Sequence, residues 1–100
     1  MEDMFGDFQA RQEAIQLKLE GIFVKADAGD GAVLITANGN GQITNVDLDK
    51  SKLDLEDSEQ LEDLFLVAVN RCLELAHAKG QEESQNMMKD LLPPGLDNLF

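Results

Sequence analysis

The sequence predicts an α+β fold in which helices pack around a three-stranded antiparallel sheet, and it predicts a binding protein that works as a homodimer. Three successive patterns support this fold class: a helix-favouring start, a central stretch of alternating apolar residues, and a strongly apolar helical stretch. The expected order is an N-terminal helix, a three-stranded β-meander, a long apolar helix, and a short C-terminal helix and tail. With 100 residues and 43% hydrophobic content, the chain is expected to form one domain over residues 1–100.

The first helix is predicted from Asp3 to about Glu20. Its apolar positions Phe8, Ile15 and Ile22 are spaced by seven, which places them on one side of a helix. The polar positions carry more acids than bases. This helix is therefore amphipathic, and its composition is not that of a basic arm.

Between Gly21 and Asp49 the apolar repeat changes to a period of two, which is typical of strands. The Gly29–Gly31 and Asn38–Gly41 segments separate the strands and supply the positive φ angles that tight turns require. A third strand is expected over 42–48. Its apolar residues fall on opposite faces if the pairing is regular, and a β-bulge near Thr44 or Asn45 would correct this.

The second helix is predicted to be apolar nearly all round. Residues 54–63 contain six acids and no base, which suits a helix N-terminus, with Asp57 or Ser58 as the cap. Lys79 and Gly80 are expected to end the helix. A helix that packs one face on its own sheet and another on a second chain is expected to be apolar nearly all round. The candidate dimer-interface residues are therefore Leu64, Leu66, Val67, Val69 and Leu73.

A polar helical segment is expected from Gln81 to about Leu91. Pro93, Pro94 and Gly95 cannot continue a helix. The remaining residues, 96–100, form a short apolar tail that either docks on the body or stays exposed as a contact.

Composition limits the compartment and the partners. The single cysteine, Cys72, excludes an intramolecular disulfide and favours a reducing compartment, and neither a membrane span nor a secretory signal is visible, so a cytoplasmic location is expected. The net charge of −12 repels phosphate backbones and anionic lipids. Binding to a membrane is therefore not expected, and binding to DNA must overcome this charge.

No group of residues points to catalysis, a metal or a cofactor. The lone His77 and Cys72 lie five residues apart on one helix, about 140° apart around its axis, so they do not form a reactive pair. Metal-ligand spacings of His and Cys are absent. The glycine-rich stretches match neither phosphate-binding motif, and both stretches lie between predicted strands, where they act as turns. The chain is not expected to be an enzyme.

Several local strings occur in an order that resembles the YbaB/EbfC family of bacterial nucleoid-associated proteins. They cover nearly the whole chain and include Met4-Phe5-Gly6, Gly29-Asp30-Gly31, Ala37-Asn38-Gly39, Val46-Asp47-Leu48-Asp49, Leu61-Glu62-Asp63-Leu64 and Pro93-Pro94-Gly95.

This resemblance implies a dimer with helical arms that binds double-stranded DNA with little sequence preference. The arms carry the DNA contacts in that family, which implies Arg11, Lys18, Lys79 and Lys89 as candidates here. The alternative is an acidic protein-interaction dimer of the same fold that does not bind DNA and instead meets a protein partner through its acidic face or its apolar tail.

Overall fold

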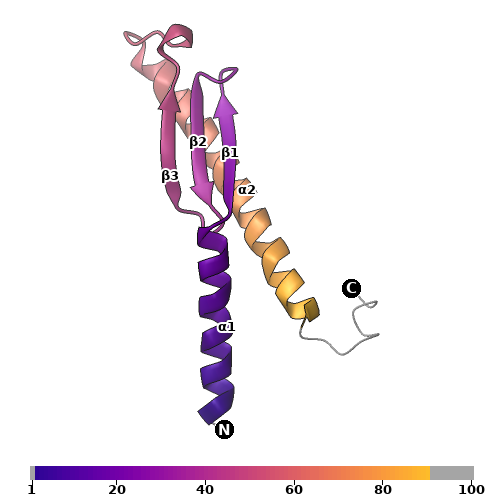
Figure 1. The fold of residues 1–100 in the computed structure, drawn as a ribbon. Helices are drawn as coiled ribbons and strands as arrows, with labels where there is room; N and C mark the ends of the chain where they lie inside the picture. Colours follow the sequence, from indigo (N-terminus) through magenta and orange to yellow (C-terminus); the bar gives the residue numbers. More distant parts are fainter. Residues whose placement is uncertain (1, 91–100) are drawn as a thin grey trace.

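The computed structural model describes residues 2–90, with their side chains except those of residues 2–5, 7 and 90. Figure 1 shows, in chain order, helix α1 (Glu2–Glu20), strands β1 (Phe23–Ala28), β2 (Val33–Asn38) and β3 (Ile43–Leu48), a 3-10 turn η1 (Lys50–Lys52) and helix α2 (Ser58–Asp90). The predicted α+β class, the three-stranded meander and the long second helix are confirmed.

The sheet is antiparallel throughout, in the order β1-β2-β3. Its β2–β3 register shifts once, because Thr36 lies opposite Asn45 whereas Ala37 lies opposite Ile43, which leaves Thr44 as the extra residue of a bulge. The predicted bulge is therefore confirmed. It brings the apolar residues of β3 onto one face, opposite Ala37, Ile35 and Val33 in turn; these are Ile43, Val46 and Leu48.

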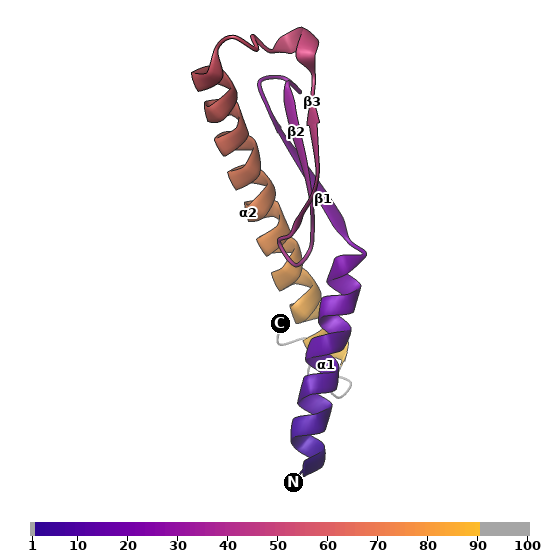
Figure 2. The ribbon, with the colours of Figure 1, turned by 90° about the vertical axis from the view of Figure 1, so that its left-hand side faces the viewer.

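Helix α2 covers one face of the sheet (Figure 2) and lies over β1 and β2. Asp57 caps its first turn, where Oδ1 accepts a hydrogen bond of 3.1 Å from the Gln60 N–H. Small residues repeated every four positions let the helix approach the sheet closely. They are Ala68, Cys72 and Ala76, and they bury Val33, Ile35 and Ala37 beneath them.

Residues 58–90 form one continuous helix, so the predicted stop at Lys79 and Gly80, and with it a separate short C-terminal helix, is wrong. A glycine that ends a helix usually adopts a positive φ, and Gly80 does not. Gly80 instead leaves room for a neighbour, since a Cβ built on it would lie 3.3 Å from the Gly39 carbonyl oxygen. The predicted tail, 96–100, lies outside the described residues.

The molecule is elongated, measuring 61 × 30 × 18 Å, with a radius of gyration of 18.6 Å. A compact domain of this length has a radius of about 13 Å. The elongation comes from two helical segments that project beyond the same end of the sheet (Figure 1). We call residues 2–20 of α1 and 79–90 of α2 the arms, and the sheet with η1 and residues 58–78 of α2 the body.

Candidate nucleic-acid interface

The four bases implied as DNA contacts all lie on the arms. Arg11 and Lys18 are exposed on α1, Lys89 is exposed near the end of α2, and Lys79 is half-buried where α2 leaves the sheet. The structure brings Lys18 and Lys79 together, while Arg11 and Lys89 stand farther out along their helices. Sequence reasoning placed these residues on helices, but it did not show which of them meet.

Lys18 and Lys79 meet at a carboxylate that the sequence analysis did not single out. The Lys18 Nζ lies 2.8 Å from one oxygen of Glu83, and the Lys79 Nζ lies 4.0 Å from the other. The hydrogen bond from Lys18 lowers the pKa of the Glu83 carboxyl below its usual range, although burial opposes part of this effect. Nothing in the local sequence distinguishes Glu83 from Glu82, since the pairing with Lys18 is long-range.

The arms touch at a small junction, which consists of Lys18 and Leu19 of α1, Gly39 and Asn40 in the β2–β3 turn, and Gly80 and Glu83 of α2. Leu19 is buried there, 6% exposed. The Gly39 N–H donates to the carbonyl oxygens of both Leu19 and Ile22 at 2.9 Å, and the Asn40 amide donates to the Gln16 carbonyl at 3.0 Å. The last turn of α1 is therefore bound to the β2–β3 turn through its backbone carbonyls, which accept hydrogen bonds from the Gly39 N–H and the Asn40 side chain.

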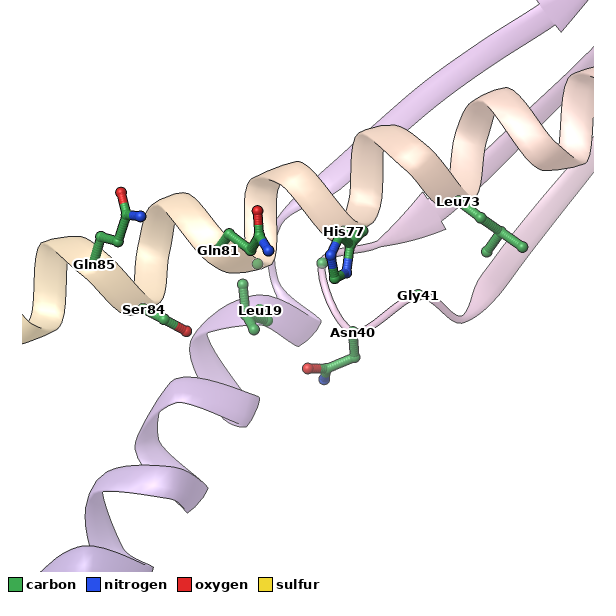
Figure 3. Close-up of a pocket in the computed structure, with 10 residues that line it drawn as sticks. Leu19, Asn40, Gly41, Leu73, His77, Gln81, Ser84 and Gln85 are labelled. Atoms are coloured by element: carbon green, nitrogen blue, oxygen red, sulfur yellow. The ribbon is translucent and has the colours of Figure 1, made fainter.

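A hollow of about 710 Å³ opens beside this junction (Figure 3). Its lining is about half polar and comes from the end of α1, the β2–β3 turn and α2; the polar side chains are Asn40, His77, Gln81, Ser84 and Gln85. Cys72 does not line it, because its thiol is buried against the carbonyls of Val24 and Ile35. Burial raises the pKa of this thiol, which keeps it protonated and unreactive.

Two of the remaining bases are held within the body. The Arg71 guanidinium donates to the Asp27 carbonyl at 3.0 Å, and the Lys52 ammonium donates to the Asp30 carbonyl at 2.7 Å. Both bonds hold the β1–β2 turn, where Gly29, Asp30 and Gly31 all have positive φ. These bases therefore have structural partners, and Lys25 and Lys50 are exposed on the body.

The five candidate dimer residues fall on different sides of α2. Leu64 packs against the β1–β2 turn, since a Cβ on Gly29 would lie 3.1 Å from it, and Val67 is 41% exposed. The other three are spaced by three and four residues, so they share one side of α2. They are Leu66, Val69 and Leu73, of which Leu66 is 62% exposed.

A second set of exposed apolar residues, on β3, was not among the predicted interface positions. Because α2 lies over β1 and β2, the face of β3 that should meet a helix stays uncovered, and Ile43, Val46 and Leu48 are each about 40% exposed. The signal was present in the sequence, since the predicted bulge already puts these three residues on one face. We call Leu66, Val69, Leu73, Ile43, Val46 and Leu48 the apolar flank.

The described part of the chain holds no helix with the length and apolar content to cross a bilayer. Within the same residues, no three His, Cys, Asp or Glu side chains gather in a way that could hold a metal ion.

Comparison with known proteins gives relatives over nearly the full length. The chain is 37% identical over 103 aligned residues to a nucleoid-associated protein of Thermodesulfovibrio yellowstonii, which covers 96% of this chain and 90% of the relative. It is 31% identical over 102 residues to a nucleoid-associated protein of Flavobacterium johnsoniae, covering 97% and 94%. A crystal structure of an uncharacterized protein from Helicobacter pylori superposes with a TM-score of 0.74 at 20% identity, covering 87% of this chain and 91% of that one, which shows a shared fold.

The model of the YbaB/EbfC DNA-binding family matches residues 1–91. It is a family of DNA-binding proteins and not of enzymes, in agreement with the residue inventory. The resemblance seen in the sequence is thus confirmed: the chain belongs to the YbaB/EbfC DNA-binding family.

Proposed function

We propose that this protein is a nucleoid-associated protein that binds double-stranded DNA with little sequence preference as a homodimer. Membership of the family carries the proposal. The geometry supports it, because the candidate bases lie on two arms that leave the body at the same end (Figure 1). Their contacts would be made with phosphates, which supply affinity but carry little sequence information.

The net charge of −12 opposes DNA binding less than it first suggests, because part of the acid lies far from the arms. The last acid of the run at the start of α2, Asp63, is separated from Glu83 by about 20 helical residues, or about 30 Å. Charges this far apart are largely screened at physiological salt, where the Debye length is about 8 Å. The acids on the arms themselves remain, so binding should be weak and sensitive to salt.

The apolar flank supports the dimer. Among the residues that the structure describes, the largest fully buried side chains are those of Ile35, Val33 and Cys72, which make a small core. Covering the flank with a second copy would add apolar burial beside that core, at about 25 cal/mol per Å² of surface removed from water. A two-fold dimer would also double the number of arms, and with it the number of phosphate contacts.

A second candidate is a protein-interaction dimer of the same fold that does not bind DNA. The observation that favours it is the acidic run at the start of α2, which lies at the end of the body opposite the arms and carries most of its acids exposed. A basic protein partner would suit such a surface.

The test measures binding of the full chain to a random-sequence DNA duplex by fluorescence anisotropy, at low and at physiological salt. Sedimentation of the same samples gives the oligomeric state. The proposal expects a dimer whose affinity falls steeply as salt rises. Absence of binding even at low salt would reject the DNA role and leave the protein-interaction dimer.

The dimer surface has its own matched pair of variants. Leu66→Asp puts a charge on the apolar flank, whereas Val67→Asp puts the same charge on the neighbouring position, which is also exposed and lies outside the flank. We expect Leu66→Asp to sediment as a monomer with weaker DNA binding and Val67→Asp to stay a dimer. Dimerisation by Leu66→Asp at wild-type strength would place the interface elsewhere.

A further inference from the structure

The direction in which α1 leaves the body is set at one place. From Gly6 to Ala14, the described residues of α1 are all exposed. Contact with the rest of the molecule begins near the last turn, at the junction. Whatever fixes the junction therefore fixes where the exposed bases of α1 point relative to α2.

The junction is closely packed around Leu19. A Cβ built on Gly39 would lie 2.8 Å from the Leu19 Cδ2, closer than packed atoms approach. A Cβ on Gly80 would meet the Gly39 carbonyl at 3.3 Å. These two glycines allow α1, the β2–β3 turn and α2 to meet at one point, but they leave the rotation of α1 about that point to other contacts.

Glu83 supplies a contact of that kind. It is 9% exposed, although its neighbours Glu82 and Gln81 on the same arm are exposed. Its two oxygens face Lys18 from α1 and Lys79 from α2. The 2.8 Å contact with Lys18 joins α1 to α2, and its buried carboxylate has less freedom to move than one in a fully exposed surface pair.

We propose that Glu83 is a positioning residue, whose carboxylate between Lys18 and Lys79 holds α1 at a fixed angle to α2 and so presets the spacing of the arms. The part of this inference that concerns DNA rests on the proposed function. In that part, Glu83 favours binding although it is itself an acid, because it keeps the arm bases in the arrangement that meets the duplex.

The arm spacing is measured directly by pulsed electron paramagnetic resonance. Spin labels are attached through Gln9→Cys on α1 and Asn86→Cys on α2, both exposed positions, and labelled chains are diluted with unlabelled chain so that distances within one chain dominate. Cys72 is buried, so protein without the two new cysteines is the labelling control. Glu83→Gln tests the proposal and Lys18→Met removes the pair from the other side.

Glu82→Gln is the matched control, because it makes the same change of charge one residue away, at an exposed carboxylate that pairs with Lys79 at 3.4 Å and does not reach α1. We expect a single narrow distance distribution in the wild type and in Glu82→Gln, and a distribution about twice as wide in Glu83→Gln and Lys18→Met. A wild-type distribution in both Glu83→Gln and Lys18→Met overturns the proposal. If Glu83→Gln fails to fold, Lys18→Met decides.

DNA affinity gives the second readout, in which a simple charge effect and a positioning effect have opposite signs. Loss of one acid should strengthen binding in Glu82→Gln, whereas Glu83→Gln should bind about fivefold more weakly, since a smaller fraction of chains has the competent arm spacing. A gain of affinity in both variants would overturn the DNA part. If no variant and no wild-type protein binds DNA, the proposed function fails while the distance measurements still decide the role of Glu83.

Discussion

The body and the arms of this protein are held by different kinds of contact. In the body, four sheet residues and three helix residues exclude water from each other almost completely, and hydrogen bonds continue along the whole sheet. In the arms, the end of α1 is hydrogen-bonded to the β2–β3 turn by Gly39 and Asn40, and it meets α2 through one leucine and one ion pair.

The difference assigns separate roles to the two regions. Burial of apolar surface is the largest favourable term in folding, so the free energy of unfolding should depend mainly on the body. Exposed charges contribute little to stability but a great deal to DNA binding. Substitutions in the body should therefore change stability first, and substitutions in the arms should change arm geometry and DNA affinity first.

The largest effect is expected in the body from Ile35→Ala. Ile35 is fully buried beneath α2, and removal of a buried isoleucine side chain costs about 2–5 kcal/mol of the free energy of unfolding. Urea unfolding at fixed protein concentration measures the change, because the stability of a dimer depends on concentration. A loss below about 1 kcal/mol would mean that the core does not lie where the structure places it.

An intermediate effect is expected at the junction from Gly39→Ala. The new Cβ would overlap Leu19, so α1 must shift, and overpacking of this kind costs about 1–3 kcal/mol. The same spin-label pair should report a changed arm distance. Gly6→Ala is the control: nothing lies within 4 Å of its Cβ, and alanine favours a helix over glycine by up to about 1 kcal/mol, so stability should not fall. An unchanged arm distance in Gly39→Ala would show that the junction does not control α1.

The smallest effect on stability is expected from the protonation of Glu83. Its pKa is lowered in the folded protein, and the charged groups that face it are Lys18 and Lys79. The folded state therefore binds this proton less readily than the unfolded state, so the stabilisation is present above the ordinary glutamate pKa and disappears as pH falls through the folded pKa. The difference in unfolding free energy between wild type and Glu83→Gln should be greatest near neutral pH and vanish in acid.

Asp49 provides the matching site in the body. Hydrogen bonds from the Ser51 hydroxyl and N–H lower its pKa, so it also loses stabilisation as pH falls. Asp49→Asn should remove part of the acid sensitivity of the unfolding free energy without altering the arm distance.

For Glu83, a difference in unfolding free energy between wild type and Glu83→Gln that stays constant with pH would contradict the assigned ion pair.

Much of the body could be predicted from the sequence because its signals are local. The period-two runs gave the strands, the glycine-rich turns gave their joins, and the mismatch of Ile43 with Val46 predicted the bulge. The arrangement of the arms could not be predicted in this way, because it depends on contacts between residues that are far apart in the chain. Gly80 was predicted to end the helix, because the sequence does not record that it makes room for Gly39. Glu83 looked like any surface acid, because its partner is on α1.

The apolar flank could be predicted only in part. Its α2 residues were among the predicted interface positions, whereas Ile43, Val46 and Leu48 were predicted only to share one face of the strand once the bulge is included. Whether a helix covers such a face depends on where the helix crosses the sheet, and no local pattern records that crossing.

The most direct test of the account compares one charge reversal on an arm with the same reversal on the body. Arg11→Glu and Lys50→Glu each lower the net charge of a chain by two, and both side chains are exposed. If the arms carry the DNA contacts, Arg11→Glu should weaken binding to a random duplex by about tenfold or more and flatten its salt dependence, while Lys50→Glu should have a much smaller effect on both. Equal losses from the two variants would show that the protein responds to DNA through its overall charge, and would contradict an interface on the arms.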